Sequence, residues 1–511
     1  MSLIDKLSST TAHGFSHIKD SEICWKKTWM VAIAVCWCIM TVQVGNHINT
    51  YLQYPSSTTV TRENTNKLET EPIISFCNRN PIVKSRSSQE AQTAFHDLEM
   101  QTVNNDSTFP ESILNSLIAG LLYEHSNESY GHELEDAVIC CSYLLGDCQI
   151  GSNVTKALTW RHSFYGNCFT IFIMPGTFLL PRTDATFTLI LTTESWEYFS
   201  NLFGTPSLKF QIHENGVIPT PESQGISLTA GNSYEIALQY SKLQRLPLPY
   251  DGIDCNRNWA NVVSPADNHI YNFLEKYLYG YSTPGQSYLS RLCVSNCLFN
   301  YFLHKRKCIY IYIMAKQSLD YIAINSSSRL CQAEQDLFAE FADVSEMSEF
   351  INNECTPVCP FECDETEYQL SITTSGYPTL RQAKSYLERF HTKVQKGNRK
   401  HYGFPLAADN LQQILEGNIT DDLLAVATKD MQNNLIFVSI HLQSFSYFHV
   451  RQSASMNGWD FLTNVGGTIG LYSGMSVLTL LELSQLLFSL CLYSGMSVFP
   501  SGTESAALLI V

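Results

Sequence analysis

The residues with the most distinctive chemistry lie in an uncharged run of 21 residues, 461–481. Gly466, Gly470 and Gly474 recur there at intervals of four, and the hydroxyl of Ser476 follows two residues later. On a helix these glycines form one smooth stripe, and such stripes let helices approach closely inside a membrane. The plainest interpretation is therefore a tight seam between two membrane helices.

A second reactive pattern consists of three cysteines, Cys355, Cys359 and Cys363, each four residues from the next. Thiolates bind zinc, but no His-x3–5-His pair and no second cysteine pair completes a tetrahedral set. The chain has 17 cysteines, of which 13 lie between Cys77 and Cys363. That density is typical of an oxidising, secretory compartment, so we predict disulfides and no metal site.

The sequence contains few patterns that are typical of enzymes. His132-Glu133 begins like a zinc-protease motif, but Asp136 stands where the second histidine is needed. The sequence has no phosphate-binding loop, dinucleotide fingerprint or serine nucleophile elbow. The net charge of −16 repels nucleic acid and attracts cations. We therefore expect neither an enzyme nor a nucleic-acid-binding protein, and no cofactor.

Two apolar segments flank a long polar middle and must position these residues. The first, 29–52, is uncharged and long enough to span a bilayer as a helix; the second, 457–490, contains the glycine stripe. Lys26 and Lys27 precede the first segment, and no base follows it until Arg62. Positive charge gathers on the cytosolic side of membrane helices, so we place the N-terminus in the cytosol.

The middle of the chain carries the marks of an extracellular domain. All five Asn-x-Ser/Thr glycosylation sequons lie there, at Asn105, Asn127, Asn153, Asn325 and Asn418. We therefore expect a multi-pass plasma-membrane protein with both termini cytosolic. Its predicted parts are a cytosolic N-terminus (1–28), a first transmembrane helix (29–52), an extracellular domain (53–456), a second transmembrane helix (457–490) and an atypical C-terminal tail (491–511).

The second apolar segment also carries the most specific signature. Residues 464–483 read Asn-Val-Gly-Gly-Thr-Ile-Gly-Leu-Tyr-Ser-Gly-Met-Ser-Val-Leu-Thr-Leu-Leu-Glu-Leu. This string closely resembles the second transmembrane segment of the epithelial sodium channel/degenerin family, Gly-Gly-x-x-Gly-Leu-x-x-Gly-x-Ser-x-Leu-Thr-x-x-Glu. The segments 71–81, 165–170 and 245–255 are similar to further motifs of that family. The resemblance extends over residues 13–483.

The resemblance implies an α+β membrane protein in which two transmembrane helices flank a large disulfide-rich ectodomain of palm, ball, finger, thumb and knuckle. One pore helix cannot enclose a channel, so several copies must assemble about an axis. The family forms trimers, which are homotrimers or heterotrimers with related subunits. The implied function is that of an amiloride-sensitive, sodium-selective channel subunit that conducts sodium passively.

Two questions stay open at this point. The family includes proton-gated, peptide-gated, mechanically gated and constitutively open members, so an extracellular peptide and a proton both remain candidate ligands. The alternative function is a non-conducting or modulatory surface receptor subunit, which is favoured if the unusual C-terminus blocks pore assembly. Leu471–Val477 recurs identically at Leu492–Val498, and the second copy is either a second membrane hairpin or a gene-model artefact.

The resemblance also assigns roles to single residues. Carbonyl and hydroxyl dipoles of a Gly-x-Ser turn can replace part of an ion's water shell. The implied sites are the selectivity filter at Gly474, Met475 and Ser476, the blocker site at Gly470, a His-Gly gating motif at His13 and Gly14, and a gate residue at Thr463. A branched residue at Thr463, where the family has Gly, Ala or Ser, suggests restricted closure.

The family's disulfide pairing can be carried over to this chain position by position. It implies the pairs Cys77–Cys168, Cys141–Cys148, Cys255–Cys363, Cys293–Cys359, Cys297–Cys355 and Cys308–Cys331. Cys140 is left over.

Apolar periodicity predicts further elements in the middle. These are a strand over 73–76, a helix near 111–122, antiparallel strands within 185–213 and 226–240, helices over 284–305 and 332–353, two short helices within 379–428, and one strand over 435–450.

Overall fold

The computed structural model describes most of the chain in twelve stretches. These are 22–64, 72–104, 130–143, 146–148, 155–162, 165–173, 186–214, 219–250, 254–257, 348–395, 408–444 and 446–479, with single residues and runs of two or three between and after them. The chain divides into two compact units. The helical unit comprises residues 1–58, 248–253 and 452–511, and the sheet unit comprises residues 59–247 and 254–451.

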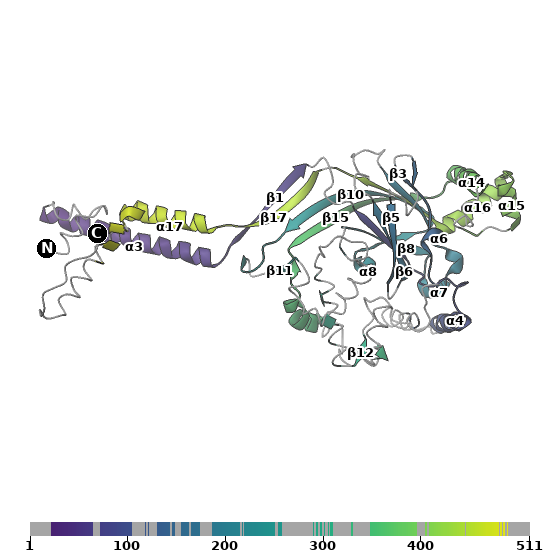
Figure 1. Cartoon of the computed structure of the whole chain (residues 1–511), viewed down its shortest axis with the longest axis horizontal. Helices are drawn as coiled ribbons and strands as arrows, with labels where there is room; N and C mark the ends of the chain where they lie inside the picture. The colour runs from purple at the N-terminus through teal and green to yellow at the C-terminus, as the bar shows by residue number, and fades with distance from the viewer. Residues whose placement is uncertain are drawn as a thin grey trace, which may run out of the picture. The chain divides into compact units, whose positions relative to one another are not determined.

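Two helices, α3 (Ile23–Leu52) and α17 (Gly458–Ser473), lie side by side in the helical unit (Figure 1). Among the described residues, Trp25–Leu52 is the one helical stretch that is long and apolar enough to cross a membrane. α3 begins six residues before the predicted segment 29–52 and takes in Lys26 and Lys27. No Pro or Gly lies between Ile23 and Trp29 to stop the helix, so its backbone extends beyond its apolar part.

The larger sheet of the protein has eight strands in the order β1-β17-β10-β16-β7-β3-β4, with β15 also paired to β10. Their bounds are β1 (Ser56–Asn64), β3 (Val138–Tyr143), β4 (Gly146–Cys148), β7 (Phe187–Thr192), β10 (Asn232–Gln244), β15 (Asp364–Gly376), β16 (Leu435–Leu442) and β17 (Ser446–Ala454). β10 is antiparallel to β15 but parallel to β16 and β17, so the sheet is mixed. The prediction of antiparallel strands therefore holds for the pairing of β10 with β15 but fails for its pairings with β16 and β17, because alternation reveals a buried face and not the direction of a neighbour.

The smaller sheet has five antiparallel strands in the order β5-β6-β2-β8-β9. Their bounds are β2 (Ile73–Asn78), β5 (Thr155–His162), β6 (Gly166–Ile173), β8 (Ser207–His213) and β9 (Ile226–Thr229). Every residue of β2 is buried, which confirms the strand predicted over 73–76 and extends it by two residues. Side chains of both sheets, including Phe76, Phe169 and Leu189, share one hydrophobic core.

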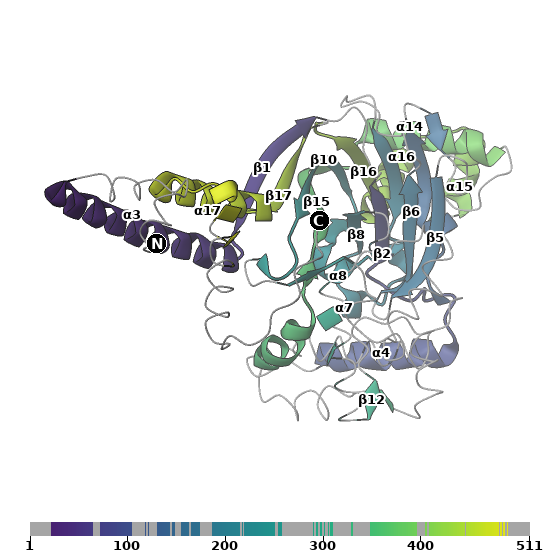
Figure 2. The same ribbon diagram turned by 60° about the vertical axis from the view of Figure 1, so that its left-hand side comes forward.

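Helices α14 (Leu380–Gln395), α15 (Ala408–Leu415) and α16 (Asp421–Asn434) gather beside the larger sheet (Figure 2). The sequence predicted only two helices here. It also predicted one strand over 435–450, whereas β16 and β17 are separated by Gln443–Phe445. Between the two strands, the Ser444 hydroxyl donates a hydrogen bond to the carbonyl of Ser446. The alternation of apolar residues continues across this polar contact, so the sequence pattern predicts one strand where the structure has two.

A third cluster packs α4 (Gln89–Asn104) against α7 (Ser200–Phe203) through Phe95, Phe199 and Phe203. It interrupts the strands predicted over 185–213, because Ser195–Phe203 forms short helical turns. The remaining short elements are α6 (Leu134–Ala137), η2 (Ser195–Glu197), α8 (Pro221–Gln224), β11 (Cys255–Asn256), β12 (Cys308–Ile309), β13 (Arg329–Leu330), η8 (Ile351–Cys355), η9 (Thr356–Val358) and β14 (Phe361–Glu362).

The sheet unit contains four of the implied disulfides. They are Cys77–Cys168, Cys255–Cys363, Cys293–Cys359 and Cys297–Cys355. Cys141 is also disulfide-bonded and lies opposite Cys148 in the β3–β4 pairing. Cys308 is described in β12, but Cys331, its implied partner, lies outside the described residues, as do most of the helices predicted near 111–122, 284–305 and 332–353.

Candidate functional site

Helix α17, which carries the glycine stripe, has a well-defined start. Asn457 accepts a hydrogen bond from the Asp460 amide, and the Asp460 carboxylate accepts one from the Asn457 amide. This reciprocal capping box satisfies amides that the first helical turn leaves unpaired. Trp459, in the same turn, is 79% exposed, as expected of an aromatic anchor at a membrane interface.

Two contacts hold α17 against α3. The ring of Tyr51 stacks on Phe461 at 4.6 Å, and the Gln43 amide donates a hydrogen bond of 3.1 Å to the hydroxyl of Tyr472. The contact partners run in opposite chain directions, so the helices are antiparallel (Figure 1). The amide–hydroxyl bond thus joins two helices whose other side chains are mostly apolar.

The uncharged run 461–481 is not one continuous helix, contrary to the sequence prediction. α17 ends at Ser473, and Gly474 adopts a left-handed conformation with φ of 63° while its amide donates to the Gly470 carbonyl at 2.9 Å. Glycine adopts this conformation without the steric cost of a side chain, and it commonly ends helices in this way. Residues 474–476 are non-helical, and helix resumes at 477–479.

Ser476 begins the second helical stretch. Its amide donates to the Thr479 hydroxyl at 3.2 Å, and the Thr479 amide donates to the Ser476 hydroxyl at 3.3 Å. The two hydroxyl oxygens are 3.2 Å apart. The arrangement is a capping box in which threonine replaces the usual glutamate. The predicted filter residues therefore form a short break between two helical stretches, which the glycine pattern alone did not reveal.

The small residues of α17 line one open face. A Cβ atom added at Gly466 or Gly467 would meet no other atom within 4 Å, and Thr463 one turn earlier is exposed. A Cβ at Gly470 would lie 3.8 Å from the Met475 carbonyl oxygen. The structure thus brings the predicted blocker position next to the predicted filter, while Thr463 lies two turns away from Gly470.

Large apolar side chains on the same segment are also exposed. Leu462, Leu471, Val477, Leu478 and Leu481 are each at least 58% exposed. Such a surface suits lipid or further helices rather than water. His13 and Gly14, the predicted gating motif, lie outside the described residues.

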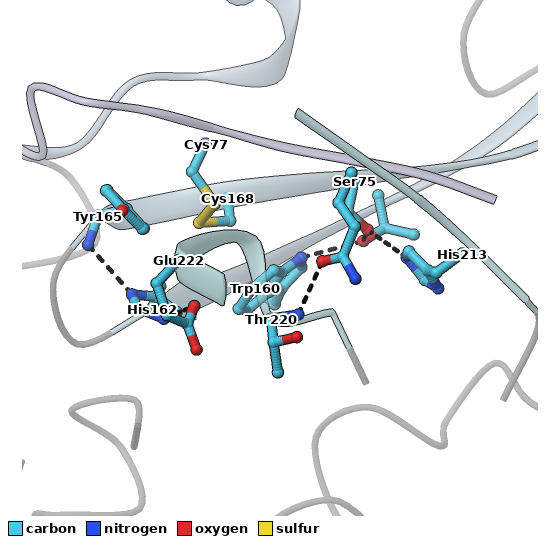
Figure 3. The surroundings of a disulfide bond; sticks show 11 residues. Ser75, Cys77, Trp160, His162, Tyr165, Cys168, His213, Thr220 and Glu222 are labelled. Atoms are coloured by element: carbon cyan, nitrogen blue, oxygen red, sulfur yellow. Dashed lines mark hydrogen bonds and ion pairs between the residues drawn. A yellow bond between two sulfur atoms is a disulfide. The ribbon is translucent and has the colours of Figure 1, made fainter. Parts of the chain in front are cut away.

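A buried polar relay crosses the smaller sheet beside the Cys77–Cys168 disulfide (Figure 3). The Trp160 indole donates to Thr170 at 3.0 Å, the Thr170 and Ser75 hydroxyls lie 2.7 Å apart, and Ser75 lies 2.8 Å from Nε2 of His213. Nδ1 of His213 lies 3.0 Å from the Glu214 carbonyl, which only accepts. His213 therefore carries its proton on Nδ1, and Nε2 accepts from Ser75.

Burial lowers the pKa of His213 to about 4, against a small opposing effect of the Glu214 carbonyl. Each group of the relay donates a hydrogen bond to the next, from the Trp160 indole to the Glu214 carbonyl. The chain of bonds requires a neutral His213, because Nε2 of a protonated ring cannot accept from Ser75. Sequence analysis missed it, because these residues are scattered over four strands and one short turn with no local motif.

A second titratable cluster joins β1 to β17. The Glu63 carboxylate accepts hydrogen bonds from the Tyr447 hydroxyl at 2.7 Å and from Nδ1 of His449 at 2.9 Å. The bond from Tyr447, followed by that from His449, holds the pKa of Glu63 below its usual value. Tyr447 in turn stacks on Tyr240 at 4.8 Å. Only the strand pairing brings these residues together, so no local motif in the sequence predicts the cluster.

The cysteines that could have held zinc are all oxidised. Cys355, Cys359 and Cys363 are bonded to Cys297, Cys293 and Cys255 respectively, which removes the thiolates that zinc requires. The Sγ of Cys140, the predicted leftover, lies 3.6 Å from the Cys141 carbonyl oxygen.

One of the five sequons falls in the described part of the chain. Asn418 is exposed and follows Gly417, whose φ is 76°. Thr420, the third residue of the sequon, caps α16 by accepting from the Leu423 amide at 3.3 Å. Its position on an exposed turn is suitable for a glycan.

Comparisons with known proteins agree with this architecture. The chain is 23% identical to an FMRFamide-activated amiloride-sensitive sodium channel of Cornu aspersum, over 94% of this chain and 82% of that protein. It is 21% identical to a bile acid-sensitive ion channel of Rattus norvegicus, over 94% and 86%. It is also 23% identical to the epithelial sodium channel subunit beta of Bos taurus, over 70% of this chain and 48% of that subunit, about half its length. A family model described as amiloride-sensitive sodium channel matches residues 7–486, so the chain belongs to that family.

Proposed function

We propose that this chain is a subunit of a sodium-selective, amiloride-sensitive cation channel of the plasma membrane. The observation that carries the proposal is the helix break at Gly474–Ser476, next to an open face of small residues on α17. Backbone carbonyls released from a helix at such a break can coordinate a partly dehydrated cation, and small neighbours let several copies of the break approach one another.

The proposal requires a second crossing and an assembly. α17 with its 16 residues reaches about 24 Å, and the residues after the break extend the path through a bilayer core of about 30 Å. One such segment does not enclose a pore, so the channel is a homotrimer or a heterotrimer with related subunits. With α3 as the other crossing, both termini lie in the cytosol and residues 53–456 lie outside.

For the gating stimulus, we propose an extracellular peptide. The relative in Cornu aspersum is activated by FMRFamide and aligns along almost the whole of this chain. The net charge of −16 favours a cationic ligand. Protons are the second candidate, supported by the Glu63–His449 pair, whose hydrogen bonds change when the carboxylate is protonated.

Expression of the full chain in oocytes tests both parts of the proposal. Two-electrode recording should reveal an inward sodium current that amiloride blocks. Replacing external sodium with potassium should abolish most of this current. Application of FMRFamide-type peptides, or a fall in external pH, identifies the stimulus. A chain that reaches the surface but carries no amiloride-sensitive current under any of these conditions contradicts the conducting function and favours the modulatory one.

The modulatory alternative has its own readout. A non-conducting subunit should alter the current of a related channel when the two are co-expressed, while carrying none alone. A conducting subunit should carry current alone or contribute its own amiloride sensitivity to the mixed channel.

A further inference from the structure

Thr479 touches both dipolar groups of the predicted constriction. Its side chain is 1% exposed, and its hydroxyl accepts the hydrogen bond from the Ser476 amide at 3.2 Å. Its own amide donates to the Ser476 hydroxyl at 3.3 Å. One buried residue is therefore bonded to the main chain and to the side chain of Ser476.

The first bond fixes a carbonyl as well as an amide. The Ser476 N–H and the Met475 carbonyl belong to the same planar peptide unit and point in opposite directions. When Thr479 accepts the N–H, it sets the direction of the Met475 carbonyl, whose oxygen lies near Gly470. Thr479 is buried, so no water takes the place of its hydroxyl as acceptor, and the peptide unit turns if the hydroxyl is removed.

The second bond fixes the Ser476 hydroxyl. Ser476 is exposed, unlike Thr479, and its oxygen has two lone pairs of which the Thr479 amide takes one. The remaining acceptor capacity is oriented by this contact and by the neighbouring Thr479 hydroxyl at 3.2 Å.

We propose that Thr479 is a positioning residue for ion selectivity, which holds the Met475 carbonyl and the Ser476 hydroxyl in the orientation that favours sodium. The proposal rests on the proposed function, since it gives the break at Gly474–Ser476 the role of the constriction. Thr479 itself does not contact the ion; it acts through Ser476.

The test replaces the hydroxyl while keeping the shape. Thr479→Val removes it isosterically, Thr479→Ser keeps it, and Thr468→Val is the matched control. Thr468, which lies in α17 before the break, is buried like Thr479, but its hydroxyl donates to the Asn464 carbonyl at 2.7 Å, away from the break. Reversal potentials in sodium and potassium give the permeability ratio for each variant, and surface biotinylation gives the amount of protein.

Thr479→Val should lower the sodium-to-potassium permeability ratio about fivefold, as expected when one orienting hydrogen bond is lost. Thr479→Ser and Thr468→Val should keep the wild-type ratio. If Thr479→Val does not reach the surface, the smaller Thr479→Ala removes the same hydroxyl without added bulk and decides the matter.

An unchanged ratio in Thr479→Val or Thr479→Ala overturns the positioning role. An equal loss in Thr468→Val also overturns it, because that result reports general disturbance of the helix. These outcomes leave the proposed function standing as long as the wild-type chain carries a sodium-selective current. Absence of that wild-type current refutes the proposed function, and the positioning role falls with it.

Discussion

At the scale of single residues, Gly470 shows how little space separates the predicted blocker position from the predicted filter. A methyl group at this position would meet the Met475 carbonyl oxygen at 3.8 Å, an ordinary contact, so Gly470→Ala should preserve folding and sodium current. If amiloride binds there, the methyl group occupies its place and should raise the half-blocking concentration about tenfold, the equivalent of about 1.4 kcal/mol of overpacking.

The control for this prediction is Gly467→Ala on the same helix, where an added Cβ meets nothing within 4 Å. Its amiloride block should match that of the wild type. Concentration–block curves for the two variants decide the matter, and equal sensitivity of Gly470→Ala and wild type would place the blocker elsewhere.

His213 makes a pH-dependent contribution to stability. An unfolded chain binds the imidazole proton near pH 6.5 and the folded protein near 4, so the unfolded state gains protons first as the pH falls. The contribution is fully present above pH 6.5 and is lost progressively down to pH 4, by about 3 kcal/mol at most. Melting temperatures of the purified protein between pH 4 and 7 measure this loss.

His213→Gln should melt at a lower temperature at pH 7 but depend less on pH than the wild type. His96→Gln, which changes an exposed histidine of α4, should keep the wild-type slope. A slope that is unaffected by His213→Gln would mean that other groups control the acid response.

At the scale of elements, three disulfides of the sheet unit form a nested ladder. Their sequence separations are 108 residues for Cys255–Cys363, 66 for Cys293–Cys359 and 58 for Cys297–Cys355. A loop of 58 residues closed alone would stabilise the fold by about 4 kcal/mol in the chain-entropy model. Because Cys293–Cys359 and Cys297–Cys355 close nearly the same loop, each should compensate for the absence of the other.

The expected result is strong non-additivity. Removing either inner disulfide by a double Cys→Ala replacement should lower the melting temperature slightly, and removing both should lower it by far more than the sum. Thermal melts of the three variants measure this. Simple additivity, or peptide mapping that joins Cys293 to Cys297, would contradict the ladder.

The sequence predicted elements well where the signal was local. The buried strand β2 follows from an apolar run between turn-forming residues, and the apolar part of α3 follows from its length without charges. The prediction failed where structure depends on distant partners. The parallel pairing of β10 with β16 and the cluster around Glu63 each bring together strands that are separated by about 200 residues or more in the sequence.

The candidate site was predicted in part for the same reason. The family resemblance pointed to Gly470 and to Gly474–Ser476, but a run without charges looks like one helix whether or not it is interrupted. The break depends on the left-handed backbone of Gly474 and on the bonds between Ser476 and Thr479. Glycine also occurs within membrane helices, so its presence alone did not reveal the interruption.

At the scale of the whole molecule, we expect one membrane topology, with residues 53–456 outside the cell. All five sequons lie between the two apolar segments, so glycosidase treatment of the membrane-expressed protein should lower its apparent mass. Asn418 is exposed, and Asn418→Gln should remove one glycan, visible as one step in gel mobility. Unchanged mobility after glycosidase treatment, or protease access to 53–456 only from the cytosolic side, would contradict the topology.

The most direct test of the central claim, that Gly474–Ser476 is the ion-selective constriction, is the reversal potential of Ser476 variants beside their surface biotinylation. Ser476→Phe should reach the surface and carry no current, because a ring fills the constriction. Ser476→Ala should conduct with weaker discrimination between sodium and potassium. The same changes at Ser497, in the repeated sequence, should leave selectivity unchanged. Loss of Ser476→Phe from the surface would favour a packing seam, and unchanged selectivity in Ser476→Ala would contradict the account.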